Sequence, residues 1–210
     1  MEREKTDEEL LAEFQQGDAD AFELLLRRHR RALYTFFVRM MGDRARAEDL
    51  AQETFLRIVK GAASWEHRAR FQTWLYAIAR NLCVDASRRD RFRRAESLDA
   101  EDGEEGRPLV DGVEDEGLTP DRGAASAQLR PILQRALSSL PVEQREVFVL
   151  REQVGLPFKE IAELSGVNEN TVKSRMRYAL LGLRKALAEE GVTAEDAEVE
   201  AVPGIRLGRA

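Results

Sequence analysis

The chain reads FKEIAELSGVNENTVKSRMRYALLGL over residues 158–183, and this stretch predicts two short helices that meet at a tight turn. The first helix is expected over residues 158–164, where the small side chain of Ala162 lets a second helix cross closely above it. Gly166 accepts the left-handed backbone of the turn without steric cost, and Asn168 is a typical N-cap for the second helix. The stretch therefore predicts a helix-turn-helix.

The second helix has two different faces. Apolar side chains at helical spacing are expected to be buried, namely Val172, Met176, Ala179, Leu180 and Leu183. The opposite stripe carries short polar and long cationic side chains, namely Asn170, Lys173, Ser174 and Arg177. Such groups near a helix N-terminus suit base edges and phosphates in a DNA major groove. The alternative is the solvated face of an ordinary helical hairpin, which the spacing alone leaves open.

Length and composition narrow the class of protein. With 210 residues, of which 43% are hydrophobic, the chain has room for one large or two small cores, and no apolar run approaches the ~20 residues of a membrane span. The charged N-terminus lacks the apolar core of a signal peptide, and the single cysteine, Cys83, fits a reducing cytoplasm. His29 and His67 stand alone. The sequence therefore predicts a cytoplasmic protein without a metal or other cofactor.

The formal net charge of −6 hides an uneven distribution. Residues 96–122 hold 11 acidic and 2 basic side chains, and residues 186–210 hold 6 acidic and 2 basic ones, so the rest of the chain carries +7. A segment as acidic and as poor in large apolar residues as 96–122 cannot bury enough surface to fold by itself. We expect two basic domains joined by a flexible acidic linker.

No strand pattern is present, so the predicted fold class is all-α. Two small helical domains, residues 1–95 and 123–187, are joined by the flexible acidic linker over 96–122, and the helix-turn-helix belongs to the C-terminal domain. A loosely ordered acidic tail is expected over 188–210.

Three helices are expected before residue 61. Their predicted caps are Thr6 (in a capping box with Glu9), Asp18 and Asp43 at the beginnings, and Gly17 and Gly42 at the ends of the first two. The third helix has an apolar stripe of Ala47, Leu50, Ala51, Thr54, Phe55 and Ile58, and an opposite face of Asp49, Gln52, Glu53 and Leu56. An acidic face with an exposed leucine is either solvated surface or a docking surface for a basic partner.

Residues 61–70 are predicted as a loop, and a long helix is expected from 71 to about 94. Its core stripe is Phe71, Trp74, Leu75, Ile78 and Leu82, and a more polar flank holds Gln72, Tyr76, Arg80, Cys83 and Ser87. Residues 80–94 hold six arginines, a strong pattern for phosphate binding. Aromatic residues nearby, Trp65 and Tyr76, suggest stacking on unpaired bases. The alternative is that the aromatic side chains only fill the core.

Helical spacing resumes at Leu129, and Pro131 indicates either a helix start near Arg130 or a kink. Pro141 begins the next helix, which Gly155 ends.

The opposite charges of the acidic segments and the basic domains further predict that the linker or tail of the free protein lies part of the time over the basic helices at low salt. The alternative is that these acidic residues only keep the chain soluble.

Segments of both predicted domains resemble one family, the bacterial RNA polymerase sigma factors of the extracytoplasmic-function (ECF) type. Region 4 of that family is similar to LPVEQREVFVLREQVGLPFKEIAELSGVNENTVKSRMRYALLGLRKAL, residues 140–187. Region 2 is similar to AEDLAQETFLRIVKGAASW (47–65) and FQTWLYAIARNLCVDASRR (71–89). The resemblance covers both domains in the family's order. The compact length, without a helical domain between them, resembles the ECF type rather than primary sigma factors.

The resemblance implies a role for each motif. Docking on the clamp helices of the polymerase's largest subunit is implied for Asp49, Gln52, Glu53 and Phe55. The resemblance also implies that one segment opens the −10 element, captures an unpaired base and contacts backbone phosphates. This segment is the 61–70 loop with Trp65, followed by Phe71, Gln72, Thr73, Trp74, Tyr76, Arg80, Asn81, Arg88, Arg89 and Arg91. Recognition of the −35 element is implied for Asn170, Thr171, Lys173, Ser174 and Arg177.

Two positions depart from the family pattern. Ser165 replaces the usual leucine before the turn glycine, which is expected to soften the packing, and Asn170 replaces a frequent glycine, which is expected to alter sequence preference. The implied function is promoter recognition, DNA melting and transcription initiation, without catalytic residues in this chain. The implied partners are core RNA polymerase, promoter DNA and an anti-sigma factor, with no small-molecule substrate and no insertion into a membrane.

Two other functions fit parts of the sequence. A free-standing helix-turn-helix transcriptional regulator would account for the C-terminal domain but leaves the N-terminal motifs without a role. A DNA-processing enzyme such as a recombinase would need a nucleophile or a cluster of carboxylates, and the acidic residues here are scattered over helix faces.

Overall fold

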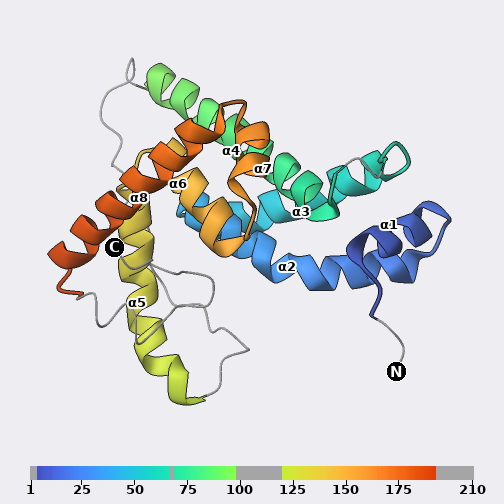
Figure 1. Ribbon diagram of the computed structural model, residues 1–210, viewed down its shortest axis with the longest axis horizontal. Helices are drawn as coiled ribbons and strands as arrows, with labels where there is room; N and C mark the ends of the chain where they lie inside the picture. The colour runs from blue at the N-terminus through green and yellow to red at the C-terminus, as the bar shows by residue number, and fades with distance from the viewer. Residues whose placement is uncertain (1–3, 67–68, 98–119, 193–210) are drawn as a thin grey trace. The chain divides into compact units, whose positions relative to one another are not determined.

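The computed structural model describes residues 4–66, 69–97 and 120–192, of which 91–97 and 120–128 are described by their backbone alone (Figure 1). Every element in these residues is helical, which confirms the all-α fold class. The chain divides into two compact units, Met1–Arg107 and Pro108–Ala210, each with its own core. Residues 98–119, most of the predicted linker, lie outside the described residues.

The first unit consists of α1 (Asp7–Gln15), α2 (Ala19–Met41), α3 (Arg44–Ala62) and α4 (Phe71–Ser97). The predicted caps are confirmed. Thr6 and Glu9 form a reciprocal capping box, and the carboxylates of Asp18 and Asp43 accept hydrogen bonds from first-turn N–H groups. Gly42 ends α2 with φ 73°, a left-handed conformation that glycine adopts without strain.

The core of the first unit lies where α2, α3 and α4 pack together, with α1 against α2 (Figure 1). The apolar stripe predicted for α3 is buried along its whole length: Ala47, Leu50, Ala51, Thr54, Phe55 and Ile58. Phe36 of α2 contacts Tyr76 of α4 edge to face, with 5.2 Å between the ring centroids.

Two predictions for the first unit need correction. α3 continues to Ala62, so the connection that follows is shorter than the predicted loop 61–70. The flank of α4 that was expected to be polar is partly core, because Tyr76 and Cys83 are only 1% and 4% exposed. The cause is that α4 packs against α1, α2 and α3, so neighbours cover more than one stripe of it. Trp74, assigned to the core stripe, is only half-buried.

The second unit consists of α5 (Pro120–Ser138), α6 (Val142–Phe148), the π-helical turn η1 (Val149–Gln153), α7 (Phe158–Ser165) and α8 (Glu169–Glu189). α8 packs against α5, α6 and α7 (Figure 1). α5 runs through Pro131, so of the two predicted alternatives the helix start near Arg130 is wrong, and the kink stays a prediction. A proline removes one backbone donor, and this helix has enough residues on both sides to continue around it.

The helix-turn-helix is confirmed. Gly166 lies between α7 and α8 with φ 67°, and the side-chain oxygen of Asn168 accepts a hydrogen bond of 2.8 Å from the backbone N–H of Thr171. The predicted apolar face of α8 is buried at Val172, Met176, Ala179 and Leu183, and half-buried at Leu180.

Ser165 makes a specific contact. Its hydroxyl donates a hydrogen bond of 2.8 Å to Oε1 of Glu146, a carboxylate of α6 that is only 6% exposed. Where the family pattern would place an apolar side chain, a hydrogen bond therefore connects α7 to α6.

The end of α8 also differs from the prediction. The helix continues to Glu189, past the expected boundary at Leu187, and the guanidinium of Arg135 donates hydrogen bonds of 2.9 and 2.6 Å to Glu190. Regular structure therefore extends into the first residues of the predicted tail. Residues 193–210 lie outside the described residues.

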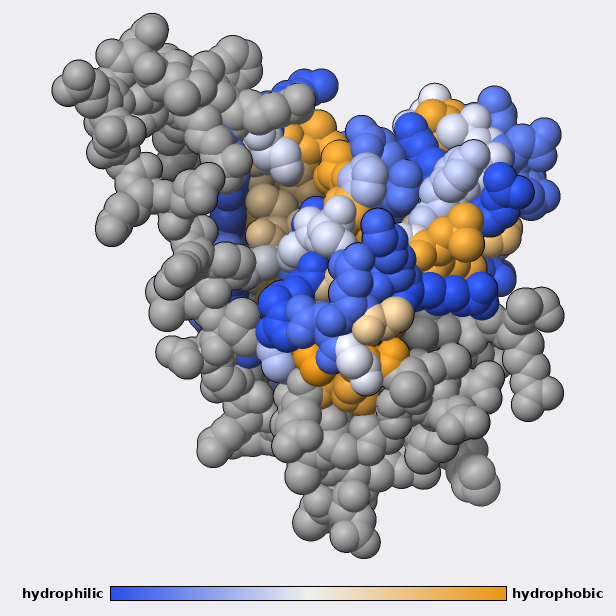
Figure 2. Space-filling view, turned by 90° about the vertical axis from the view of Figure 1, so that its left-hand side faces the viewer, coloured by the Kyte–Doolittle hydropathy of each residue, from blue (hydrophilic) through white to orange (hydrophobic). Residues whose placement is uncertain are grey.

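Large apolar side chains are exposed at a few positions among the described residues. They are Leu56 and Val59 on α3, Val142 on α6, and Tyr178 and Leu181 on α8. On the face shown in Figure 2, apolar residues emerge in separate groups between hydrophilic ones.

Candidate nucleic-acid interface

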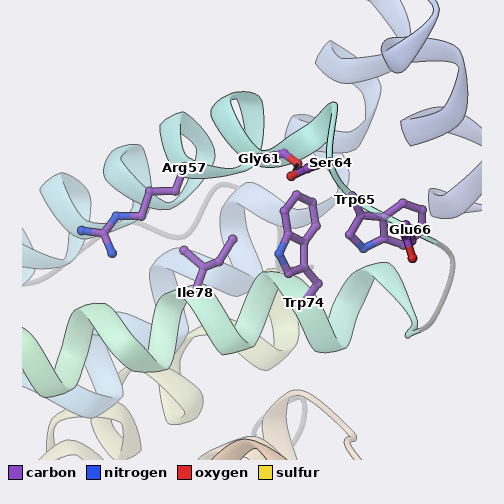
Figure 3. Close-up of a pocket in the computed structure, with 7 residues that line it drawn as sticks. All are labelled: Arg57, Gly61, Ser64, Trp65, Glu66, Trp74 and Ile78. Carbon is purple, nitrogen blue, oxygen red and sulfur yellow. Dashed lines mark hydrogen bonds between the residues drawn. The ribbon is translucent and has the colours of Figure 1, made fainter.

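A pocket of about 540 Å³ lies in the first unit, where the end of α3 approaches the beginning of α4 (Figure 3). Two tryptophans dominate it: the rings of Trp65 and Trp74 have centroids 6.1 Å apart and planes inclined by 34°. The residues that line the pocket are Arg57, Gly61, Ser64, Trp65, Glu66, Trp74 and Ile78. Its wall thus combines aromatic faces with a cation, a carboxylate and a hydroxyl.

Local backbone geometry places the two indoles. The backbone N–H groups of Ser64 and Trp65 donate to the carbonyls of Gly61 and Ala62, at 3.1 and 3.0 Å, so the chain turns directly after α3. Gly61 allows the close approach of Trp74, since a Cβ at position 61 would lie only 3.1 Å from the indole. A glycine one turn before Trp65 is therefore part of the pocket's construction.

The residues predicted for the −10 element divide into accessible and buried groups. Trp65 and Trp74 line the pocket, Gln72 and Arg80 are half-buried, and Asn81, Arg88 and Arg89 are exposed. Thr73 is largely buried at 9% exposure. The side chain of Arg91 lies outside the described residues.

Phe71 and Tyr76 require a correction. They are 0% and 1% exposed, so their rings belong to the core and offer no face to a base. Phe71 packs edge to face on Trp74, with 6.2 Å between the ring centroids, and so supports the pocket from behind. Burial raises the pKa of the Tyr76 hydroxyl, which therefore stays neutral.

The arginines of α4 are partly engaged by the protein itself. Arg89 Nε donates to the carbonyl of Asp85 at 3.3 Å, and Asp90 forms an ion pair with Arg46 of α3. Arg46 also donates to the carbonyl of Ala86 at 3.0 Å, which fixes this part of α4 on α3.

The acidic face predicted on α3 is exposed at Asp49 and Gln52. Glu53 accepts a hydrogen bond of 2.9 Å from Arg57, and this bond lowers the pKa of the Glu53 carboxyl. Leu56 and Val59 extend the same helix surface with exposures of 53% and 43%. The face therefore combines carboxylates with an apolar ridge.

Phe55, predicted for the same docking face, points the other way. It is 8% exposed, and its ring packs edge to face against Phe22, which in turn packs on Phe14. This aromatic row connects α1, α2 and α3, so Phe55 supports the face from inside.

On α8 the predicted stripe is exposed at Asn170, Lys173, Ser174 and Arg177. Lys173 forms an ion pair of 2.7 Å with Glu169, and the guanidinium of Arg177 lies 5.2 Å from the ring centroid of Tyr178.

Thr171 is the exception in this stripe. It is half-buried, and its hydroxyl donates to the Asn168 side chain at 3.0 Å, so in this structure it completes the N-cap.

Sequence patterns missed several residues of the site. The spacing of α3 singles out Leu56 but not Val59, and Arg57, Ser64 and Glu66 join the tryptophans only when the turn after α3 folds. Gln15 and Glu8, far away in sequence, reach the same region through hydrogen bonds to Ala62 and to Phe71. Among these features, only Gly61 could have been noticed in the sequence, as a small residue one helical turn before Trp65.

Among the described helices, none has the length and apolar character needed to cross a membrane. The same part of the chain contains no group of three or more His, Cys, Asp or Glu side chains that could hold a metal ion.

Comparison with known proteins gives consistent matches for both units. The family model of Sigma-70 region 2 matches residues 25–93, and that of Sigma-70, region 4 matches residues 130–181. The ECF RNA polymerase sigma factor SigW of Bacillus subtilis is 33% identical over 180 residues, which cover 85% of this chain and 95% of SigW. SigM of Mycobacterium tuberculosis, also an ECF RNA polymerase sigma factor, is 34% identical over 184 residues, which cover 88% of this chain and 86% of SigM.

A solved structure agrees with these matches. The sigma factor RpoE from Bartonella quintana, in complex with the anti-sigma factor NepR, has a TM-score of 0.61 and 25% identity, and the match covers 80% of this chain and 96% of RpoE. The match to Sigma-70 region 2 spans the pocket and the acidic face of α3. The match to Sigma-70, region 4 includes the exposed stripe of α8. With two regions of one family present in order, and with relatives aligned over most of their length, the chain belongs to the ECF RNA polymerase sigma factors.

Proposed function

We propose that the chain binds core RNA polymerase, opens promoter DNA at the −10 element by taking an unpaired base into the pocket between α3 and α4, and recognises the −35 element with α8. The observation that carries this proposal is the pair of tryptophans, Trp65 and Trp74, on one wall of an accessible pocket (Figure 3).

The pocket has the chemistry that an unpaired base requires. Stacking of a base on an aromatic side chain contributes about 1–3 kcal/mol and is available only when the base has left the duplex. A pocket of about 540 Å³ is within the usual range of small-ligand sites. Arg57, Ser64 and Glu66 at its edge offer donors and acceptors for the polar rim of the base. Binding a single unpaired base in this way would stabilise melted DNA.

The exposed arginines of α4 supply the electrostatic part. Arg88 and Arg89 lie on the exposed surface of the helix that begins beside the pocket, so they are available to backbone phosphates. Phosphate contacts fix the register of a protein on DNA, while base contacts carry sequence information. We assign Arg88 and Arg89 to the first role and the pocket to the second.

For the −35 element, α8 has the geometry of a recognition helix. Asn170, Ser174 and Arg177 lie on its exposed side within three turns of its N-terminus, where helix-turn-helix proteins contact base edges. Arg177 is suited to a bidentate contact with guanine, and Lys173 to a phosphate.

The exposed surface of α3 is the proposed contact with core polymerase. Asp49 and Gln52, together with the apolar ridge of Leu56 and Val59, offer a basic partner both charge complementarity and apolar contact. We assign nucleotide addition to the polymerase, so the chain would contribute recognition and melting and no reaction of its own. Its place of action is then the cytoplasm, where polymerase and DNA meet.

Run-off transcription with purified core polymerase tests this function. Core polymerase with the wild-type chain should start at defined promoters on host DNA, with permanganate-reactive thymines around the −10 element. Trp65→Ala should keep promoter binding and lose most of the reactivity, while Trp65→Phe, which retains a stacking ring, should keep most of it. A chain that bound its DNA equally well without polymerase, and gave no run-off product with it, would instead be a free-standing regulator.

A second measurement addresses the polymerase contact. Asp49→Arg should abolish co-purification with core polymerase without changing helicity, because it reverses the charge beside the apolar ridge. Glu23→Arg is the matched control, since Glu23 is an exposed carboxylate on a different helix, α2. Equal losses in both variants would point to net charge rather than to this face.

An anti-sigma factor is the further partner that we propose. The support is the RpoE relative, whose structure contains the anti-sigma factor NepR. A protein from the host that co-purifies with the chain and blocks run-off transcription would identify it.

A further inference from the structure

α1 holds both ends of the connection between α3 and α4, although it precedes the match to Sigma-70 region 2. At the C-terminal end of α1, Gln15 Nε2 donates to the carbonyl oxygens of Ala62 and Trp65, at 2.7 and 3.1 Å. Near its N-terminal end, Glu8 Oε1 accepts a hydrogen bond of 2.9 Å from the backbone N–H of Phe71. One helix of 9 residues thus contacts the backbone on both sides of the pocket.

These contacts satisfy backbone groups that helix ends leave without an intrahelical partner. Ala62 is the last residue of α3, and Phe71 is the first residue of α4. The carboxylate of Glu8 also interacts favourably with the positive end of the α4 dipole. Side chains of α1 therefore favour ending α3 and beginning α4 at these residues. Those two points determine where Trp65 and Trp74 lie.

α1 is itself fixed on the first unit. Its residues Leu10 and Leu11 are 1% and 0% exposed. The carboxylate of Asp7 contacts His29 Nε2 at 2.6 Å and accepts a hydrogen bond of 3.0 Å from Arg28 Nη1. Because α1 is anchored in this way, its hydrogen bonds join two parts of the fold that already have fixed positions, and little freedom is lost in making them.

We propose that Gln15 and Glu8 are positioning residues for promoter opening: they fix the ends of α3 and α4 and thereby hold Trp65 and Trp74 in place in the lining of the pocket. The proposal rests on the proposed function of the pocket. Neither residue lines the pocket, so both act through the backbone that carries the tryptophans.

The chain contains only two tryptophans, and both line the pocket, so intrinsic fluorescence reports on this site alone. The variants are Gln15→Ala and Glu8→Ala, with Glu8→Gln as the conservative change that keeps an acceptor oxygen for Phe71. Gln16→Ala, at the exposed C-cap of the same helix, is the matched control. Each variant is measured as free protein by tryptophan emission and acrylamide quenching. As holoenzyme it is measured by the rate of promoter opening and by affinity for a −35 duplex.

We expect Gln15→Ala and Glu8→Ala to show red-shifted, more easily quenched emission and to open promoters about three- to tenfold more slowly, the factor that corresponds to one hydrogen bond of ordinary net strength. Affinity for the −35 duplex should not change. Gln16→Ala should behave as wild type. Glu8→Gln keeps the acceptor oxygen and loses only the charge, so it should lie closer to wild type than to Glu8→Ala. Circular dichroism melts identify a variant that is simply unfolded, and the pair Glu8→Ala and Glu8→Gln then decides the question.

Wild-type opening rates in both alanine variants would overturn the inference, as would unchanged fluorescence or a Glu8→Gln variant as slow as Glu8→Ala. The proposed function fails separately. If Trp65→Ala opens promoters at the wild-type rate, the pocket is not the base site. If Trp65→Ala is slow while Gln15→Ala and Glu8→Ala are not, the pocket keeps its function and only the positioning role of α1 is wrong.

Discussion

Asp7 shows how much one side chain can contribute to the first unit. Its carboxylate contacts His29 and Arg28 on α2, and the His29 ring packs 5.3 Å from the ring of Phe71, which supports Trp74. The hydrogen bond from His29, with a smaller effect of Arg28, holds the pKa of Asp7 below its ordinary value of 3.8. A residue on α1 is thus connected through two contacts to the back of the pocket.

Asp7→Asn is expected to lower the free energy of unfolding by about 1–2 kcal/mol near neutral pH, because two charge-assisted contacts are weakened. The folded-state pKa lies below the unfolded one, so the Asp7 contribution is complete above pH 3.8 and is lost as the pH falls through the lower folded value. Urea titrations followed by circular dichroism should show the gap between variant and wild type closing on acidification. Asp20→Asn, at an exposed carboxylate of α2, is the control.

Ser165 leads to a second residue-scale prediction. Because its hydroxyl donates to the buried carboxylate of Glu146, Ser165→Ala should destabilise the protein by roughly 1–3 kcal/mol. Ser165→Leu restores the side chain usual in the family but removes the same donor, so it should also destabilise. Thermal melts measure both. A more stable leucine variant would show that apolar packing outweighs the hydrogen bond at this position.

Among the elements, α8 offers the sharpest test of DNA recognition. Lys173→Ala should weaken binding to all sequences alike, whereas Arg177→Ala should cost about 1–3 kcal/mol at one base pair of the −35 element and little elsewhere. Lys185→Ala removes a cation with 80% side-chain exposure near the other end of the same helix and should leave both properties unchanged. Binding of holoenzyme to a set of −35 duplexes with single substitutions measures the difference.

If Lys173→Ala and Arg177→Ala both bound every duplex like wild type, the exposed stripe of α8 would not be the reading face. If Lys185→Ala weakened binding as much as Lys173→Ala, the effect would be one of total charge.

The sequence predicted the elements well wherever the determinants are local. Caps such as Asp43 and Asn168 contact groups three residues away, and the turn at Gly166 needs only its own backbone. Burial was predicted correctly for α3, which has one covered stripe, and incorrectly for Tyr76 on α4, which several helices cover. The hydrogen bond from Gln15 to Ala62 spans 47 residues, and no spacing within a helix could have predicted it.

On the scale of the whole molecule, the distribution of charged residues along the chain follows from the sequence alone. Acidic residues concentrate in segments 96–122 and 186–210, while the remainder of the chain carries +7. The structure refines this division, because Glu190, in the predicted acidic tail, forms an ion pair with Arg135 of α5. Residues 98–119 and 193–210, which lie outside the described residues, hold most of the remaining acidic side chains of these segments.

Replacing the acidic residues of 101–116 by their amides should tighten binding of the free protein to DNA several-fold at low salt, because the linker would no longer compete with phosphates for the basic helices. Deleting residues 193–210 should have a smaller effect in the same direction. Shuffling the order of residues 101–116 is the control and should change nothing. Fluorescence anisotropy with labelled DNA at 20 mM and 150 mM salt measures the effect, which screening should remove at the higher concentration. Unchanged affinity at low salt would leave solubility as the role of these acidic residues.

The π-helical turn η1 contains one residue more than an α-helical turn needs, so it should tolerate the loss of one residue. Its defining bond, from the N–H of Val154 to the carbonyl of Val149 at 3.2 Å, encloses one residue more than an α-helical bond does. Removing one residue from this turn, such as the half-buried Glu152, would leave an ordinary α-helical turn with the same residues before and after it. We therefore expect that homologues can lose a single residue within 149–153 without a change in the helix-turn-helix that follows, and an alignment gap at these residues would show it.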